Sequence, residues 1–200
     1  LRSAASWGID VKCVELVPSV LKAFPYFFED ANSVLSLPNV EVIIDDGRRY
    51  LNRTRSKYDV IIIDPPPPIE AASTSLLYSR EFYEIIAKHL TKGGIFQQWF
   101  PTGENKIFEA FVRSLVDVFP YIRVYKSFEG WGFHFLASME PFQTPSSKDV
   151  VSRLPPLAKN DIVEWADKTE LPNYTEKEAL IEKYFNKSFE KELSVELLLN

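Results

Sequence analysis

The chain has 200 residues, 46% of them hydrophobic and 26% charged, with a formal net charge of −5 at pH 7. This composition predicts a globular fold with a sizeable core, and the negative charge argues against nucleic acid or an anionic membrane surface as the main partner. No apolar stretch approaches the roughly 20 residues that cross a bilayer, and the single cysteine, Cys13, excludes an internal disulfide and fits a reducing compartment.

The first part of the chain alternates between predicted helices and strands. Gly8 closes the end of a helix, and the next helix begins with a proline, which is acceptable in a first turn. The apolar pattern predicts, in order, a helix end over 1–7, a strand over 11–16, a helix over 18–29, a strand over 40–44, a short helix at "DDGRRYL" and a strand over 58–63.

The alternation continues and ends in two adjacent strands. The pattern predicts a helix over 76–90 that ends at "KGG", a strand over 95–100, a helix over 104–118, and strands over 122–128 and 132–138. The last two are close enough in sequence to form an antiparallel pair. The predicted fold class is therefore α/β, with a doubly wound, mostly parallel, Rossmann-like sheet that ends in an antiparallel hairpin.

Beyond Pro141 the chain is more polar, and prolines separate predicted helices over 147–154, 160–167 and 175–199. We divide the chain into a Rossmann-like nucleoside-binding catalytic domain over 1–140 and a helical C-terminal extension over 141–200. The last helix carries an apolar stripe, which favours packing against the domain over binding of a partner. The stripe consists of Leu180, Ile181, Tyr184 and Phe185.

The stretch "YDVIIIDPPPP" places an aspartate directly after a buried strand. The apolar run ends at Asp64, and the prolines that follow, Pro65–Pro68, cannot extend a sheet because they have no N–H to donate. Ligands bind at the carboxyl ends of the strands in open α/β sheets. The sequence therefore predicts a carboxylate on a rigid rim, available for a ligand.

Three acidic residues end three successive predicted strands: Glu15, Asp46 and Asp64. Each alone is more often a helix cap or a solvated loop residue. Together they suit a nucleoside, since a carboxylate after the first crossover can accept both ribose hydroxyls. Asp46 can accept a hydrogen bond from the exocyclic amine of a nucleoside base, and Gly47 lets the backbone approach its flat ring.

Other candidate groups carry weaker signals. His89 and His134 lack carboxylate or cysteine partners at ligand spacing, so we expect no metal site. Trp99 and Trp131 could form the wall of an apolar pocket, although aromatic residues in strands more often belong to the core. The basic stretch "RRYLNRTRSK" favours a solvated helix face over a nucleic-acid site.

Five blocks of the sequence together resemble a known family. They are "VELVPSV", "DDGRRYL", "YDVIIIDPPPP", "LLYSREFYEIIAKHLTKGGIFQQW" and "GWGFHFLAS". Their order and spacing resemble those of the spermidine synthases, or polyamine aminopropyltransferases, which are built on the sheet of class I S-adenosylmethionine-dependent methyltransferases. The resemblance covers about Val11 to Ser138.

The resemblance implies a donor, an acceptor and a set of site residues. The donor is decarboxylated S-adenosylmethionine, or S-adenosylmethionine itself, the acceptor is a small-molecule amine, and no metal is needed. Asp64 is the implied catalytic carboxylate, because an amine with a pKa of roughly 10.4 must lose a proton before it attacks carbon. The implied nucleoside-binding residues are Glu15, Leu16, Asp46, Gly47, Asp64 and Pro65, and the implied acceptor-binding residues are Tyr78, Trp99 and Trp131.

The chain departs from the pattern of this family at three places. Pro67 stands where a second aspartate usually helps to hold a diamine, Val17 replaces an acidic residue, and a tyrosine before the last strand is absent near Ser127. The identity of the acceptor therefore stays open. Some divergent members are fused to membrane-spanning segments, so we expect either a cytoplasmic protein or the cytoplasmic part of an anchored one, with a homodimer left open.

The sequence leaves two other functions open and predicts an upstream segment. A small-molecule methyltransferase would use the same sheet, and a non-catalytic nucleoside-binding or scaffold domain fits the departures described above. The chain begins at Leu1 within a helical pattern, and its only methionine is Met139. We therefore expect an upstream segment that carries the first strand of the sheet and its glycine-rich turn.

Overall fold

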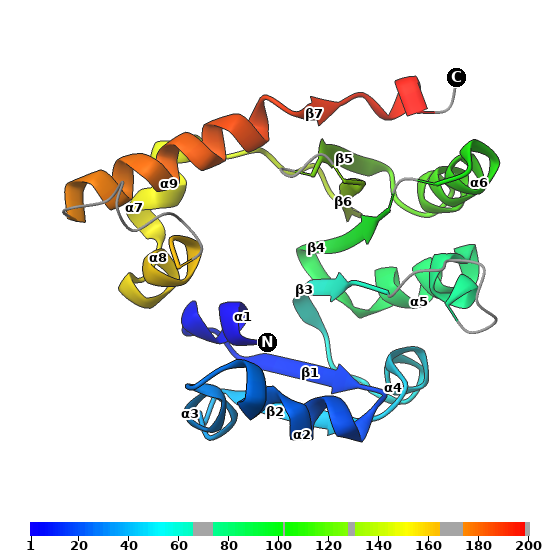
Figure 1. Cartoon of the computed structure of the whole chain (residues 1–200). Coiled ribbons are helices and arrows are strands. Elements are labelled where there is room, and N and C mark those ends of the chain that lie inside the picture. Colours follow the sequence, from blue (N-terminus) through cyan, green and yellow to red (C-terminus); the bar gives the residue numbers. More distant parts are fainter. Residues whose placement is uncertain (66–73, 102, 128–130, 165–173, 199–200) are drawn as a thin grey trace. The chain divides into compact units, whose positions relative to one another are not determined.

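The computed structural model describes residues 1–65, 74–101, 103–127, 131–164 and 174–198 (Figure 1). Contacts divide the chain into two compact units. Unit 1 comprises Leu1–Tyr50 and Pro145–Asn186, and unit 2 comprises Leu51–Thr144 and Lys187–Asn200. The segment after residue 144 thus contributes to both units, and the predicted division at residue 140 stays a prediction.

Unit 1 combines a parallel strand pair with short helices. Its elements are α1 (Arg2–Ser6), β1 (Val11–Glu15), α2 (Pro18–Phe27), α3 (Ala31–Leu35), β2 (Val40–Ile44), the first part of α4 (Gly47–Arg53), α7 (Ser147–Arg153), α8 (Pro156–Ile162) and most of α9 (Tyr174–Phe189). Gly8 adopts φ +69 after α1, a left-handed conformation that favours glycine and ends the helix as predicted. Strands β1 and β2 pair in parallel, with Glu15 opposite Ile44.

The helices after residue 145 have a core of their own. Its buried members are Val151, Leu154, Ala158, Val163 and Ile181, and Leu180 and Phe185 pack against them. The apolar stripe predicted in the last helix is therefore confirmed at these three positions of α9. The helix predicted over 160–167 is instead α8, which begins at Pro156 because proline suits the first turn of a helix.

Unit 2 contains a five-stranded mixed sheet. Its elements are β3 (Tyr58–Ile63), η1 (Ser75–Tyr78), α5 (Arg80–His89), β4 (Leu90–Phe100), α6 (Asn105–Val116), β5 (Tyr121–Lys126), β6 (Phe133–Ser138), β7 (Glu192–Leu193) and η3 (Val195–Leu198). The strand order is β3-β4-β6-β5-β7, in which β3 and β4 are parallel and the other pairs are antiparallel. The predicted α/β class and the predicted β5–β6 hairpin are confirmed.

Three predicted boundaries in unit 2 are wrong. The helix predicted over 76–90 is interrupted at Ser79, whose extended backbone and side-chain hydroxyl cap α5 by accepting from the amide of Phe82. Helix α5 ends at His89, so "KGG" lies inside β4. The last predicted helix ends at Phe189, and the chain then adds β7 to the sheet beside β5.

Aromatic side chains form the core of unit 2. Helices α5 and α6 contact each other, and Figure 1 shows both on the same side of β4. The rings of Phe100 and Phe111 stack with centroids 4.4 Å apart, and those of Phe111 and Phe135 meet edge to face at 4.7 Å. This packing fixes the carboxyl end of β4 against α6 and β6. The fully buried aromatic side chains are Phe82, Tyr83, Phe96, Phe100, Phe119 and Phe135.

Candidate functional site

Glu15 lies at the carboxyl end of β1 in unit 1. Its Oε1 accepts a hydrogen bond from the amide of Val17 at 2.8 Å, at the turn that leads into α2. The second carboxylate oxygen has no partner in the part of the chain that the structure describes. Leu16, the next residue, is 61% exposed. This strand end therefore offers one carboxylate oxygen and an apolar side chain to a ligand.

Two aspartates follow β2, and they have different roles. Asp45 is 6% exposed and accepts from the amide of Asp46 at 2.8 Å and from the guanidinium of Arg49. Asp46 is half-buried, and its Oδ1 accepts from the amide of Arg49 at 2.7 Å, which caps α4. Sequence reasoning missed the structural role of Asp45, since adjacent identical residues give no signal that separates them.

The structure brings Glu15 and Asp46 to the same edge of the β1–β2 pair. The amide of Asp45 donates to the carbonyl oxygen of Glu15 at 3.1 Å, so the two strands end side by side. At Gly47 a side-chain methyl would meet no atom within 4 Å. Space is therefore open along the backbone at the start of α4.

Asp64 lies at the carboxyl end of β3 in unit 2. The preceding residue, Ile63, pairs with Gln98 of β4. Asp64 is exposed, Pro65 is buried, and Pro66–Pro68 lie outside the described residues. Within the described ranges, the carboxylate of Asp64 forms no hydrogen bond or ion pair.

Tyr78 is a buried phenol at the end of η1. It is 6% exposed, and its ring meets those of Phe100 and Phe111 edge to face, each at 5.6 Å. Its hydroxyl has no hydrogen-bond partner among the residues described. Burial, with a smaller contribution from the charge of Asp64, raises the pKa of Tyr78 to about 12. The phenol is therefore a neutral hydrogen-bonding group at physiological pH.

His134 is a second neutral group within the electrostatic reach of Asp64. Gln97 Nε2 donates to its Nδ1 at 3.2 Å. Burial lowers the pKa of His134, and the charge of Asp64 partly opposes this shift. Sequence reasoning treated His134 only as an unsuitable metal ligand. No local signal could have placed it, because its position depends on the pairing of β6 with β4, which sets His134 opposite Trp99.

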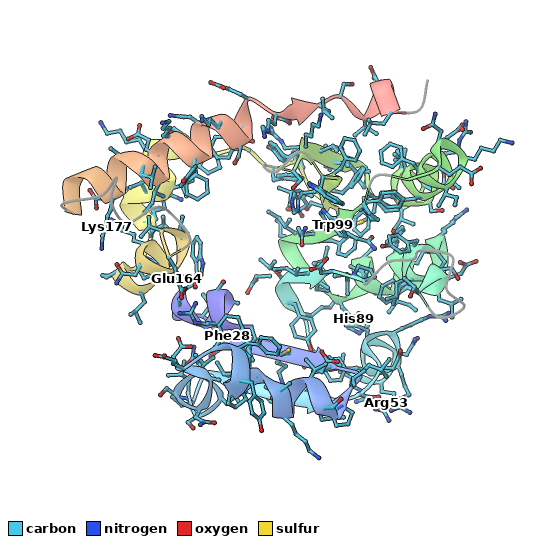
Figure 2. All side chains as sticks on the ribbon, in the orientation of Figure 1. Phe28, Arg53, His89, Trp99, Glu164 and Lys177 are labelled. Atoms are coloured by element: carbon cyan, nitrogen blue, oxygen red, sulfur yellow. The ribbon has the colours of Figure 1, made fainter. Side chains whose placement is uncertain are left out.

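Gly132, directly before β6, packs against the end of β4. Gly132 adopts φ +63, and a Cβ there would lie 2.2 Å from the carbonyl oxygen of Phe100 and 3.0 Å from Trp99 Nε1, so only glycine fits. Trp99, labelled in Figure 2, is half-buried. Trp131 is 71% exposed. The structure therefore brings Trp99, but not the side chain of Trp131, into a packed environment.

His89 has a structural role. Its Nδ1 lies 2.8 Å from the carbonyl oxygen of Ile85 and its Nε2 lies 3.2 Å from that of Thr54. These contacts tie the end of α5 to the segment before β3. Across the described ranges, no group of three or more His, Cys, Asp or Glu side chains is arranged so that it could hold a metal ion, and none of the helices described there is long and apolar enough to cross a membrane.

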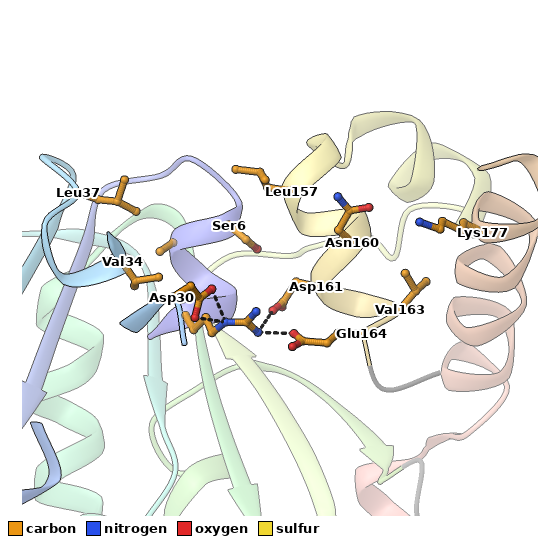
Figure 3. A pocket seen from close by; sticks show the side chains of 12 residues that line it. Ser6, Asp30, Val34, Leu37, Leu157, Asn160, Asp161, Val163, Glu164 and Lys177 are labelled. Atoms are coloured by element: carbon orange, nitrogen blue, oxygen red, sulfur yellow. Dashed lines mark hydrogen bonds and ion pairs between the residues drawn. The ribbon is translucent and has the colours of Figure 1, made fainter. Parts of the chain in front are cut away.

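A pocket of about 590 Å³ lies within unit 1, and neither Glu15 nor Asp46 lines it (Figure 3). Arg2 stands in its wall. The Nε of Arg2 donates to the carboxylate of Asp30 at 2.7 Å, and another guanidinium nitrogen donates to Asp161 at 3.1 Å and to Glu164. Hydrogen bonds to Glu164 and Asp30 raise the pKa of Arg2 further. One cation thus ties α1 to α3 and to α8.

Comparison with known proteins defines first the class and then the family. The fold matches that of spermidine synthase from Thermotoga maritima, with a TM-score of 0.55, 21% identity, and coverage of 90% of this chain and 60% of that one. It also matches human methyltransferase-like protein 13 in complex with SAH, with a TM-score of 0.52, 16% identity, and coverage of 76% and 82%. The class is the α/β fold that spermidine synthases and methyltransferases share.

The family follows from the sequence. Residues 9–128 match the family model of the spermine/spermidine synthase domain, and the chain belongs to that family. Polyamine aminopropyltransferase 2 of Hyperthermus butylicus is 33% identical over 132 residues, which are 62% of this chain and 41% of that protein. The chain therefore spans about two fifths of the length of this relative. The predicted family resemblance is confirmed.

Proposed function

We propose that the protein transfers an aminopropyl group from decarboxylated S-adenosylmethionine to an amine, with Asp64 as the acceptor-side base. The observation that carries this proposal is the state of Asp64. It is an exposed carboxylate at the end of β3, which is an edge strand and not the buried strand that the sequence predicts, since Val60 and Ile62 are 52% and 61% exposed. Asp64 has no hydrogen bond to a described residue, and its charge acts on two neutral side chains, Tyr78 and His134. A carboxylate in this position can bind an ammonium group.

The chemistry assigns Asp64 two tasks. The carboxylate binds the acceptor as an ammonium and then takes a proton from the nitrogen, which frees its lone pair. The nitrogen attacks the aminopropyl carbon next to the sulfonium, the carbon–sulfur bond breaks, and its electrons return to sulfur. The products are a secondary amine and methylthioadenosine, and the proton passes from Asp64 to water. The sulfonium is already a good leaving group, so the protein's task is positioning and proton transfer.

On the donor side, we assign the nucleoside to residues of unit 1. Glu15 keeps one carboxylate oxygen for ribose hydroxyls, and Leu16 offers an exposed apolar surface beside it. Asp46 accepts from the adenine amine, and the open space at Gly47 allows a flat ring to approach the backbone. We assign Asp64 and Pro65 to the reacting end of the donor.

On the acceptor side, the groups assigned to the amine are Tyr78, Trp99 and Trp131. Tyr78 and His134 are neutral at physiological pH, and Trp99 and Trp131 carry no charge. Among these four residues and Asp64, only Asp64 is charged. Pro67, which replaces the second aspartate of the family, lies outside the described residues. This charge balance favours an acceptor with one ammonium group over a diamine.

Product analysis tests the proposal. The purified protein is incubated with an amine mixture and either decarboxylated S-adenosylmethionine or S-adenosylmethionine, and products are identified by mass. Aminopropylated amine with methylthioadenosine is the expected result. Methylated product would favour a methyltransferase instead, a function that the shared fold also allows. Tight calorimetric binding of methylthioadenosine without any turnover would favour a nucleoside-binding scaffold.

A further inference from the structure

Gln98 is an unusual residue for the place it occupies in β4. It is 0% exposed and lies on the same strand face as Phe96 and Phe100, which are also fully buried. A buried amide costs free energy unless its donors and acceptor are satisfied, whereas an apolar side chain would suit this aromatic core without that cost. The presence of Gln98 therefore needs an explanation in its contacts.

Both ends of the Gln98 amide are hydrogen-bonded. Its Oε1 accepts from the hydroxyl of Tyr83 at 2.7 Å, and its Nε2 donates to the carbonyl oxygen of Leu77 at 3.3 Å. Tyr83 is itself fully buried in α5. The amide thus joins three elements, β4, α5 and η1, at one point.

These contacts involve the direct neighbours of two residues of the acceptor side, Tyr78 and Asp64. Leu77 directly precedes Tyr78, and Gln98 pairs across the sheet with Ile63, which directly precedes Asp64. A side chain that holds the carbonyl of Leu77 to β4 therefore sets where Tyr78 stands relative to the end of β3. The electrostatic effect of Asp64 on Tyr78 agrees with this placement.

We propose that Gln98 and Tyr83 are positioning residues that fix η1 against β4, so that the Tyr78 hydroxyl and the Asp64 carboxylate bind the same acceptor nitrogen. The inference rests on the proposed function and assigns these two side chains a role in recognition of the acceptor. Neither touches the substrate. They act through the backbone of Leu77 and the side chain of Tyr78.

A cycle of three variants separates positioning from stability: Tyr83→Phe, Gln98→Leu and the double variant. Tyr83→Phe leaves the Gln98 Oε1 without its donor, and Gln98→Leu leaves both the Tyr83 hydroxyl and the Leu77 carbonyl without theirs, so both single changes destabilise the fold. The double change removes the Tyr83–Gln98 pair and leaves only the Leu77 carbonyl unpaired, so part of the stability is recovered. The tie to Leu77 stays broken, however, and we expect kcat/KM for the amine to remain ~10-fold or more below wild type, with unchanged affinity for methylthioadenosine. Recovery of turnover together with stability would overturn the proposal.

Ser138→Ala is the matched control. Ser138 is 1% exposed, and its hydroxyl donates to the carbonyl oxygen of Gly94 at 2.8 Å. This hydrogen bond is buried in the same sheet but does not involve η1. We expect this variant to lose stability without a change in kcat/KM for the amine. An equal loss of amine turnover in this variant would contradict a specific role for Gln98.

A readout that needs no turnover keeps the inference separate from the proposed function. The amide of Leu77 donates to the carbonyl oxygen of Thr74 at 2.9 Å within η1. We expect its hydrogen exchange to accelerate in Gln98→Leu and in the double variant, but not in Ser138→Ala. If the wild type transfers no aminopropyl group, the proposed function fails. Unchanged exchange at Leu77 in the double variant would instead refute the positioning role.

Discussion

The carboxylates that end strands in unit 1 differ from the one that ends a strand in unit 2. Glu15 and Asp46 each accept a backbone N–H from a residue two or three positions further on, which caps the turn or helix that follows. Asp64 accepts none from the residues described. An acidic residue at the same kind of strand end therefore serves local structure in one unit and is left available in the other.

The difference follows from the residues that come next. Val17 and Arg49, which lie two and three positions after their carboxylates, both have an amide N–H to donate, whereas Pro66 and Pro67, at the same positions after Asp64, have none. The Asp64 carboxylate therefore cannot accept an N–H from either position, and burial of Pro65 fixes the backbone there. The chain thus keeps a carboxylate exposed and rigidly placed, which is what a proton acceptor for a bound amine requires.

Substitution of Asp64 should have the largest effect. Asp64→Asn keeps the size and polarity but removes the charge that binds an ammonium and the base that takes its proton. We expect aminopropyl transfer to fall by ~10²-fold or more while the fold and the affinity for methylthioadenosine are retained.

The control for this variant is Asp59→Asn. Asp59 is also exposed, lies near the other end of β3, and accepts from the hydroxyl of Thr91 at 2.7 Å. We expect the Asp59→Asn variant to transfer the aminopropyl group at the wild-type rate. Wild-type turnover by Asp64→Asn would show that Asp64 is not the base, and loss of nucleoside binding together with activity would place it on the donor side instead.

The second prediction concerns the charge of the acceptor. A desolvated ammonium group that lacks a carboxylate partner costs on the order of 2–5 kcal/mol. With Pro67 in place of the second aspartate, putrescine should show a kcat/KM at least ~30-fold below that of a primary monoamine of similar length. Steady-state kinetics with matched amines measure this ratio. Efficient turnover of putrescine would mean that another residue supplies the missing charge.

The third prediction separates the two roles of Glu15. Glu15→Gln keeps a carbonyl oxygen that can accept the Val17 amide, but it removes the charge proposed to bind ribose hydroxyls. We expect the KM for the donor to rise ~10-fold with little change in melting temperature. Glu41→Gln is the control, since Glu41 is an exposed residue of β2 that pairs with Lys12 at 2.6 Å. A change in melting temperature without a change in the KM for the donor would show that Glu15 only caps the turn before α2.

The fourth prediction concerns stability at high pH and not activity. Tyr78 has a pKa of about 12 in the folded protein and about 10 in an unfolded chain. Between these values the unfolded chain loses a proton that the folded protein keeps, so stability falls as the pH rises, by up to about 2.7 kcal/mol. Tyr78→Phe should therefore lose less stability than the wild type between pH 10 and 12, measured by urea unfolding. Equal losses in both proteins would contradict the burial of this phenol.

The strands were the most predictable part of the molecule. Runs rich in valine and isoleucine, bounded by polar residues, predict β2 and β3, and the limits of both strands match the prediction. The positions of Glu15, Asp46 and Asp64 at strand ends followed directly. Periodicity gives no sign of a short interruption, however, so the break at Ser79 between η1 and α5 was missed although serine is a strong cap.

Residues that depend on pairing between distant segments could not be predicted. The tail reads as one charged helix, yet Leu193 pairs with Val124 in a sheet edge formed some 70 residues earlier in the chain. His134 and Gln98 acquire their roles through cross-strand register and through contacts with η1 and α5. Local sequence patterns carry no information on such partners, because the same residues would suit a plain hairpin strand.

The division of the chain between the two units bears on its synthesis. The chain passes from one unit to the other after Tyr50, after Thr144 and after Asn186, and α4 and α9 each cross a boundary. The core that α9 completes in unit 1 consists of residues from Val151 onward. Domains usually fold one after another as they leave the ribosome. Here unit 1 must wait for α9, and unit 2 for its edge strand β7, so neither unit can close until the ribosome has passed these elements.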